Sequence, residues 1–374
     1  MPHISYPGIY IDEIPSGDPS IRACDTTTAA FVGKTQKGDL NRAVPVQTRQ
    51  EYQDHFGTII DDSFLAQSVD HFFMNGGKRC YIVRVPAPTR MSGVSQPDLF
   101  TKAFHALDDI DEISLLAAPG IGTSWITDAG MEYCENRRNL FYIGETGRGD
   151  RSASHALAFK SRLNPAGSRG AVYFPWILDS SGRQPVLSPP SGGIAGLYAR
   201  TDLSKGVWKA PAGLDALLKG TGKPSCTITD PDQDRLNPAG INAIRKFEPT
   251  GTVVWGARTL SRDPEWRYVP IRRTAMMIEE SISRGTRWAV FEHNDSNLWI
   301  RVKQTIALFL GNLFREGALQ GAKDSEAFYV RCGRGETMTQ ADIDQGRLII
   351  EIGIALLRPA EFIVLRIQQA ISGK

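Results

Sequence analysis

Two glycine-containing segments come nearest to known phosphate-binding motifs. Gly33-Lys34-Thr35 closes an apolar run, but a phosphate-binding loop also needs a glycine five residues before its second glycine, and Thr28 stands there. Gly222-Lys223 is followed by Pro224 instead of serine or threonine. Both segments are therefore interpreted as turns, and a nucleotide-binding α/β enzyme is kept only as a distant alternative.

Other ligand-binding and catalytic patterns are also incomplete. Gly120-Ile121-Gly122 has Trp125 in place of the third glycine of a dinucleotide fingerprint, and Glu292-His293 is not the histidine pair of a zinc-binding helix. Glu279 and Glu280 are adjacent and would diverge by about 100° on a helix, which favours a solvated face over a carboxylate pair. The sequence predicts no catalytic residue, no cofactor and no metal site, and therefore no enzyme.

Composition and charge argue against several other classes of protein. The chain has 374 residues with 43 basic and 41 acidic side chains, a net charge of +2 and no block of like charge, unlike a typical nucleic-acid-binding protein. No apolar run approaches the ~20 residues of a membrane span, and no signal peptide is visible, so synthesis in the cytoplasm is expected. The five cysteines are widely spaced, as expected for reduced and mostly buried thiols.

Strand and helix signals alternate and predict an α/β or α+β fold with mixed sheets. In the first two thirds of the chain we expect strands at 26–32, 80–85, 113–118, 140–143 and 171–176, helices at 63–75 and 131–138, and a loop at 180–193. Pro270 opens a helix that Gly285 ends, and Asp295 caps a second helix. The apolar stripe of that second helix is Leu298, Val302, Ile306, Phe309 and Leu313.

Shorter elements are expected near the C-terminus. Residues 288–291 and 328–330 read as strands, and Thr339 with Asp342 forms a capping-box-like start to a short helix. Residues 348–357 are apolar on both faces, which predicts a central strand.

Each terminus carries an apolar strand that proline-containing sequence separates from the rest of the chain. The residues of these two strands are Ile9, Tyr10, Ile11 and Ile14 at one end and Phe362, Val364, Leu365 and Ile367 at the other. An unpaired strand exposes hydrogen-bonding groups and can add to the sheet of another chain. Two such arms would link subunits into a network. The alternative is that both strands fold back as edge strands of their own domain.

Several segments, in the order of a known family, resemble the tail sheath proteins of contractile phages and related injection systems. They include YPGIYIDEIPSG at 6–17, TTAAFVG at 27–33, RGTRWAVFE at 284–292 and LRPAEF at 357–362. The other matching segments are 72–85, 189–202, 206–212, 255–260, 266–269 and 339–344. Gly213 departs from the family pattern, where asparagine is expected after Pro211-Ala212.

The resemblance implies a structural subunit that polymerises in stacked rings around an inner tube and contracts to drive that tube through a target envelope. Its expected partners are further copies of itself, the inner tube protein, sheath paralogues, and baseplate and terminal cap proteins, but neither nucleic acid nor a membrane. The compact chain resembles the sheath of an extracellular contractile injection system. A myophage tail sheath is the alternative. Both alternatives imply that the protein assembles in the bacterial cytoplasm and is then present in a released particle or a virion tail.

The resemblance also implies a division of the chain and strand exchange by the terminal arms between neighbouring subunits. We expect an N-terminal arm and linker at 1–24, a core domain in two parts at 25–95 and 251–357, a middle outer domain inserted at 96–250, and a C-terminal arm at 358–374.

A sheath that grips and then releases its tube should use a weak, polar contact. The candidate is the short helix that begins at Thr339, with Asp342, Asp344 and Arg347. The competing candidate is the polar face of the helix capped by Asp295, with Arg301, Lys303 and Arg315. A further alternative is that both faces only meet solvent.

Overall fold

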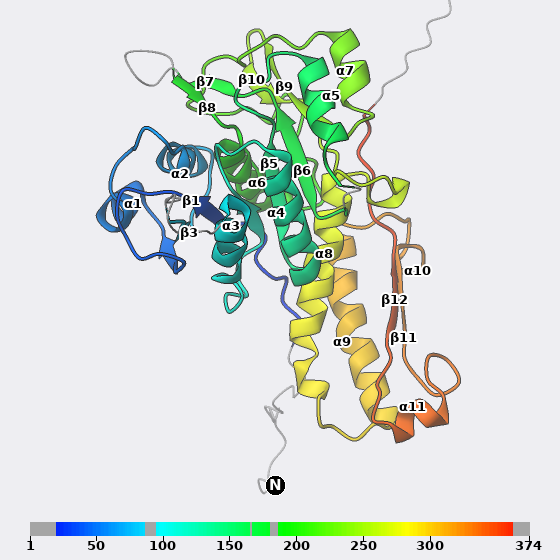
Figure 1. Cartoon of the computed structure of the whole chain (residues 1–374). Helices are drawn as coiled ribbons and strands as arrows, with labels where there is room; N and C mark the ends of the chain where they lie inside the picture. Colours follow the sequence, from blue (N-terminus) through cyan, green and yellow to red (C-terminus); the bar gives the residue numbers. More distant parts are fainter. Residues whose placement is uncertain (1–19, 87–94, 165–166, 180–185, 362–374) are drawn as a thin grey trace, which may run out of the picture. The chain divides into compact units, whose positions relative to one another are not determined.

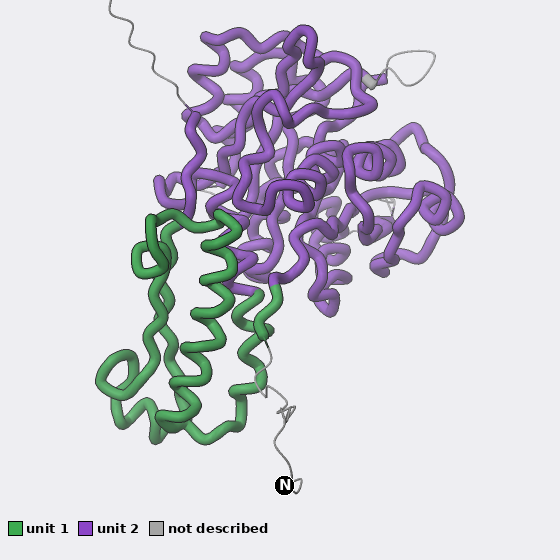
Figure 2. The backbone as a smooth tube through the Cα atoms, turned by 180° about the vertical axis from the view of Figure 1, so that it is seen from behind, with its two compact units in different colours: residues 1–22, 281–355 green, residues 23–280, 356–374 purple. Residues whose placement is uncertain are grey.

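The computed structural model describes residues 20–86, 95–164, 167–179 and 186–361 (Figure 1). The chain divides into two compact units, coloured separately in Figure 2. The larger unit comprises Ala23–Glu280 and Leu356–Lys374, and the smaller unit Met1–Arg22 and Ser281–Ala355. Helix α8 (Val269–Gly285) contains the boundary between them. The mixed α/β fold expected from the sequence is confirmed.

An eight-stranded sheet organises the larger unit, in the order β10-β9-β6-β5-β4-β1-β3-β2. The six inner strands are parallel, and the edge strands β10 and β2 run antiparallel to their neighbours. The inner strands are largely buried, which explains their nearly continuous apolar sequences. The strands are β1 (Ala29–Gly33), β2 (Ala43–Val46), β3 (Cys80–Arg84), β4 (Leu115–Ala117), β5 (Phe141–Glu145), β6 (Gly170–Phe174), β9 (Ile241–Phe247) and β10 (Gly251–Val254).

Helices cover both faces of this sheet. Phe31 and Tyr173 belong to the core under α1, α2 and α6, whereas their neighbours Val32 and Val172 belong to the core under α3 and α4. This alternation follows from the two-residue period of a strand. The helices are α1 (Arg49–Phe56), α2 (Leu65–Met74), α3 (Gln96–His105), α4 (Ser124–Arg137), α5 (Ala153–Ser161), α6 (Ser191–Lys205) and α7 (Asp230–Leu236). A small ribbon, β7 (Ile177–Asp179) with β8 (Val186–Ser188), and the 3-10 helix η1 (Pro264–Trp266) complete the larger unit.

Helices α2 and α6 pack with their backbones very close together. Gly192 and Gly196 lie one turn apart on α6. A methyl group added at Gly192 would overlap the backbone oxygen of Ser68, and one added at Gly196 would overlap that of Phe72. Only glycine at these positions therefore allows α6 to approach α2 this closely.

The smaller unit is built on the long helix α9 (Ser296–Arg315). Its predicted apolar stripe is buried, and Asp295 accepts a hydrogen bond from the Leu298 N–H, so both predictions are confirmed. An antiparallel pair, β11 with β12, contacts α9 through β11. The remaining elements are η2 (Arg287–Ala289), α10 (Asp324–Ala327), β11 (Phe328–Arg331), α11 (Gln340–Asp344) and β12 (Glu351–Ile354).

Three predicted elements differ from the structure. The loop expected at 180–193 instead contains β8 and the start of α6, because its glycines serve close helix packing and not chain reversal. Residues 288–291 are not a strand: the first two belong to η2 and the other two to the loop after it. The guanidinium group of Arg301 lies 4.6 Å from the centroid of the Trp288 ring. Of residues 348–357, only β12 is a strand, and among the residues that the structure describes it pairs with β11 alone in a two-stranded sheet.

Substitution of Gly196 by alanine tests the close packing of α2 and α6. Alanine normally favours a helix by about 1 kcal/mol over glycine, yet overlap with the Phe72 backbone should reverse the sign. We expect Gly196→Ala to lower the free energy of unfolding by about 1–3 kcal/mol, measured by urea denaturation. Gly149→Ala is the control, since nothing lies within 4 Å of the added methyl group. Equal stability of the two variants would contradict the packing argument.

Candidate assembly surfaces

The order of the parallel strands reverses between β1 and β4. The chain passes from β1 to β3 on one side and then crosses to β4 on the other. In doubly wound sheets, ligands bind in the crevice at the carboxyl ends of the two strands that flank such a reversal. Lys34 follows β1, and Gly120 comes shortly after β4. Two of the three incomplete glycine motifs of the sequence, those at Gly33 and Gly120, therefore lie at this point of the fold.

Side chains of the protein itself occupy the crevice. Phe64 lies so close to Gly120 that a methyl group added there would overlap its ring. The Phe64 ring also packs edge-on against Trp176, with 5.1 Å between ring centroids, and the guanidinium group of Arg148 lies 5.2 Å from the Phe64 ring. The Lys34 ammonium group, which would contact phosphate in a phosphate-binding loop, is 2.7 Å from the Asp62 carboxylate.

A buried carboxyl group occupies the start of helix α6. Glu145, the last residue of β5, accepts hydrogen bonds from the backbone N–H groups of Gly120 and Ser191. Ser191 is the first residue of α6, so this side chain takes the position at a helix N-terminus where an anionic ligand could bind. Burial raises the pKa of Glu145 to about 7, against the lowering effect of its hydrogen bonds.

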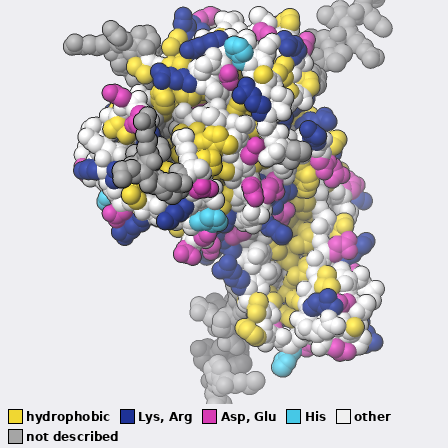
Figure 3. All heavy atoms as spheres, in the orientation of Figure 1, with side chains coloured by type: hydrophobic (Ala, Val, Ile, Leu, Met, Phe, Trp, Pro, Cys, Tyr) yellow, Lys and Arg dark blue, Asp and Glu magenta, His cyan; other side chains and the backbone are white. Residues whose placement is uncertain are grey.

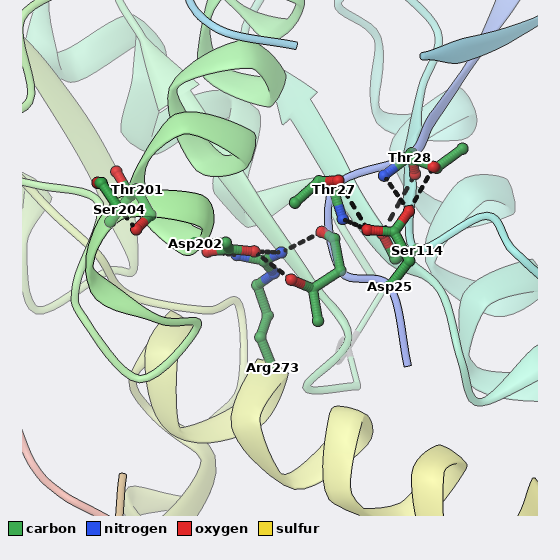
Figure 4. Close-up of polar contacts among 9 residues, drawn as sticks. Asp25, Thr27, Thr28, Ser114, Thr201, Asp202, Ser204 and Arg273 are labelled. Carbon is green, nitrogen blue, oxygen red and sulfur yellow. Dashed lines mark hydrogen bonds and ion pairs between the residues drawn. The ribbon is translucent and has the colours of Figure 1, made fainter. Parts of the chain in front are cut away.

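The chain just before β1 is fixed by a buried ion pair (Figure 4). Arg273 of α8 donates to both carboxylate oxygens of Asp202 of α6, at 3.1 and 2.6 Å, and its side chain and that of Asp202 are 4% and 3% exposed. The same guanidinium group donates to the Thr26 carbonyl at 2.8 Å, and the Thr26 hydroxyl donates to Asp202 at 2.7 Å. Asp25 accepts from the backbone N–H groups of Thr27 and Thr28. We call residues 25–28 the N-terminal root.

A second ion pair fixes the chain at the start of the C-terminal arm. The guanidinium group of Arg258 donates to both carboxylate oxygens of Glu361, with its Nε at 3.0 and 3.2 Å. Arg258 is held in turn by the Asn237 carbonyl at 3.1 Å and by the Asn242 side chain, which accepts from its backbone N–H at 2.7 Å. Residues 357–361, the C-terminal root, line a cleft of about 640 Å³ that also contains Trp208 and Trp255.

The arm residues predicted from the sequence lie outside the described residues. They are Ile9, Tyr10, Ile11, Ile14, Phe362, Val364, Leu365 and Ile367. The structure thus describes the two roots and not the arms. The partners of both roots were not predicted from the sequence, since nothing in the spacing of Asp202 and Arg273, or of Arg258 and Glu361, indicates that they meet. Asp202, Arg258 and Glu361 do fall within segments that carry the family resemblance.

The structure brings the three predicted tube-contact residues together on one exposed segment. Thr339 and Asp342 form the predicted capping box of α11, and their hydrogen bond lowers the pKa of Asp342. Arg347 pairs with Asp342 at 2.9 Å, and Gln340 donates to Asp344 at 2.8 Å. This surface carries both signs of charge.

The competing residues on α9 are engaged within the smaller unit. Arg301 stacks on Trp288, the Lys303 ammonium group lies 3.7 Å from the Glu336 carboxylate, and Arg315 donates to the Gly311 carbonyl and the Asn312 side chain. Their charges are therefore partly directed to partners in the same unit.

The described residues contain no group of three or more His, Cys, Asp or Glu side chains that could hold a metal ion. None of the helices among them is long and apolar enough to cross a membrane.

Comparison with known proteins assigns the family. The phage tail sheath protein central domain matches residues 104–260, and the phage tail sheath C-terminal domain matches residues 261–370. The sheath of the PVC extracellular contractile injection system in its contracted state is 34% identical, with a TM-score of 0.84 and 98% of each chain covered. The contracted helical sheath of the anti-feeding prophage (AFP) is 33% identical, with a TM-score of 0.80, and the match covers 98% of this chain and 100% of that one.

Curated relatives agree with this assignment. A putative prophage major tail sheath protein of Pseudomonas aeruginosa (strain UCBPP-PA14) is 30% identical over 213 residues, 55% of this chain and 53% of that protein. The chain thus spans about half the length of this relative. The tail sheath protein of Escherichia phage P2 is 24% identical over 278 residues, 71% of this chain and 66% of that protein. With two family domains that together cover residues 104–370, this chain belongs to the phage tail sheath protein family.

Proposed function

We propose that this chain is the sheath subunit of an extracellular contractile injection system, which polymerises around an inner tube and contracts to drive it through a target envelope. The supporting observation is the similarity to the contracted PVC and AFP sheaths, which extends over 98% of this chain and at least 98% of theirs. The phage tail sheath alternative has weaker support, because the curated phage relatives are matched over 66% of their length or less. The other partners are baseplate and cap proteins, and the particle assembles in the producing cell and acts after release.

The terminal arms complete a neighbour's sheet. Among the described residues, β11 and β12 pair only with each other, which leaves one free edge on each. A two-stranded sheet is marginally stable alone, and its free edges present N–H and C=O groups to an added strand. The apolar segments around Tyr10 and Val364 have the composition to fill those edges. Each subunit then donates two strands and receives two.

The two roots fix where each arm leaves the larger unit. The ion pairs of Arg273 and Arg258 hold residues 25–28 and Glu361. A force applied to either arm is therefore transmitted directly to the sheet of the larger unit. In the proposed division into a two-part core, an inserted middle domain and two arms, the two roots lie at the ends of the core parts and transmit this pull.

No catalysis is required for this function. Phe64 and Glu145 occupy the crevice in which a doubly wound sheet would bind a ligand, so a nucleotide has no ready site there. The energy for work comes from an extended lattice that a kinetic barrier keeps from relaxing to the contracted one. The α11 surface grips the tube, since exposed ion pairs at about 0–1 kcal/mol each can be released in that step.

Truncation of either arm tests the assembly proposal. Deletion of residues 1–17 or of 362–374 keeps both roots, including Glu361, and should leave a folded, soluble protein because the arms contribute to a neighbour and not to their own unit. Neither variant is expected to form long tubes in electron micrographs, whereas the full chain should. Tubes of normal length from either truncated chain would contradict strand exchange.

Replacement of Glu145 by glutamine tests the filled crevice through its pH dependence. The pKa of Glu145 in the folded state, about 7, lies above that of a glutamate in an unfolded chain. The folded state therefore binds the proton more tightly, and this group should make the protein less stable as pH rises from about 4.5 to about 7. Relative to Glu145→Gln, the wild type should lose stability over that range and change little above it, as measured by urea denaturation at each pH.

A constant difference between the two proteins across this pH range would contradict the buried position of Glu145. The same assay tests nucleotide binding, because a ligand that binds only the folded state raises stability. Magnesium and ATP are expected to leave the unfolding midpoint unchanged, and a rise that Lys34→Ala abolishes would support the enzyme alternative instead.

A charge reversal at Asp344 tests the tube contact. Asp344 accepts from Gln340 on the exposed side of α11, so Asp344→Lys changes the surface and leaves the capping box of Thr339 and Asp342 intact. The variant should assemble poorly on preformed inner tubes, with the loss reduced at high salt, yet should still form empty, contracted-like tubes.

The matched control for Asp344→Lys is Asp54→Lys on α1. Gln50 donates to Asp54 at 2.9 Å with the same spacing, so both variants lose an equivalent hydrogen bond and gain the same charge. Asp54→Lys should assemble as the wild type does. If Asp344→Lys also builds normal extended sheaths, α11 is not the contact, and the same test moves to Lys303 on α9.

A further inference from the structure

A phenylalanine stands fully exposed at the tip of the loop between α8 and α9. Phe291 is 103% exposed relative to a free residue, and its neighbour Val290 is 62% exposed. The backbone of Phe291 has φ 72°, in the left-handed region that a bulky side chain rarely adopts. An exposed aromatic side chain on a strained backbone is unfavourable for an isolated subunit, and such strain tends to be kept at functional positions.

Hydrogen bonds order the loop that carries Phe291. The N–H groups of Ala289 and Val290 donate to the carbonyls of Thr286 and Arg287 at 2.9 and 3.2 Å, and the Glu292 N–H donates to Ala289 at 3.3 Å. Below the tip, Trp299 of α9 donates to the Asn294 side chain at 2.7 Å. The outward position of Val290 and Phe291 is therefore fixed by hydrogen bonds on both sides.

The tip adjoins the proposed tube contact. The Asn294 side chain donates to the Arg347 carbonyl at 3.1 Å, and Arg347 pairs with Asp342 of α11 at 2.9 Å. Figure 1 shows the α8–α9 loop and α11 at the same end of the smaller unit. Ile300 and Leu308 are exposed apolar side chains of α9 itself. Figure 3 shows a hydrophobic band on the smaller unit. Leu308 lies 13 residues beyond Asp295, about 20 Å along the helix axis.

We infer that Val290 and Phe291 form an apolar anchor that inserts into the inner tube beside the polar α11 contact. This inference rests on the proposed function and names the missing part of its tube contact. The partner is a tube surface with a shallow apolar recess, and a basic group at its rim would complement Glu292, which follows Phe291 in the chain. Aromatic anchors within polar rims carry most of the affinity in many interfaces.

The size of the anchor suits a contact that must release. Stable complexes bury roughly 800 Å² on each partner, and two side chains cover only a small part of that area. The tip therefore cannot hold a second copy of this chain on its own. A single aromatic anchor per subunit, repeated along the tube, gives a grip that the contraction of the sheath can break.

The test replaces Phe291 by asparagine, a residue that adopts left-handed φ values more readily than phenylalanine. Three quantities are measured for the full chain: stability to urea, formation of empty contracted-like tubes, and extended sheath on tubes assembled from the inner-tube protein of the same particle. We expect Phe291→Asn to match or exceed the wild type in stability, to form empty tubes normally, and to reduce extended sheath by about tenfold or more. Leu308→Asn is the control for loss of an exposed apolar side chain, and it should retain extended sheath.

Normal extended sheath with Phe291→Asn would overturn the inference. Loss of both extended sheath and empty tubes would overturn it as well, because it would place Phe291 against a neighbouring copy. Asp344→Lys, measured in parallel, separates this inference from the proposed function. If Phe291→Asn reduces extended sheath on inner tubes and Asp344→Lys does not, the result supports the apolar anchor and contradicts the α11 contact. If the wild-type protein forms no extended sheath on the inner tubes, the proposed function itself is contradicted.

Discussion

The buried pair of Arg273 and Asp202 is the interaction on which the arrangement of the larger unit most depends. It joins α6, α8 and the chain segment that enters β1, three parts that are far apart in the sequence. A buried ion pair is weak evidence for added stability, because desolvation of two charges offsets much of their attraction. Its effect here is geometric. The guanidinium group satisfies both the carboxylate and the Thr26 carbonyl, so the root of the N-terminal arm has one position relative to the central sheet.

The same geometric logic applies at the other end of the chain. The Arg258–Glu361 pair fixes the chain at residue 361, just as the Arg273 contact fixes the N-terminal root. Among the described residues of the smaller unit, β11 and β12 form a two-stranded sheet, and each strand has a free edge. In the proposed strand exchange, the arms of one copy fill such edges in the next copy, and a head-to-tail contact of this kind builds an open polymer when the rotation between copies does not close a ring.

The sequence predicted the elements whose formation depends on residues close to one another in the chain. The parallel strands around Phe31 and Ile82 were predictable because full burial requires apolar runs, and the capping box of Thr339 and Asp342 because it lies within four residues. The central position predicted for the strand at 348–357 is wrong, because apolar composition does not distinguish a central strand from the strand of a two-stranded sheet. The start of α6 was missed because its glycines have a role only in the presence of α2. The root ion pairs, which join residues about 70 and 100 positions apart, have no sequence signal short of the family resemblance.

A doubly wound sheet with a filled crevice shows how a fold common among ligand-binding proteins can serve mechanics, and it limits where the work of contraction arises. Function belongs to sites and not to folds, and here Phe64 and Glu145 remove the usual site. A change of state can be driven only by interactions that differ between the two states. The crevice and the two roots lie within one compact unit, so a unit that moves as a body keeps them unchanged and they supply no driving force. The difference must therefore come from surfaces that exchange partners. The surfaces proposed above to exchange partners are the edges of β11 and β12, the charged face of α11 and the exposed tip at Phe291, all in the smaller unit.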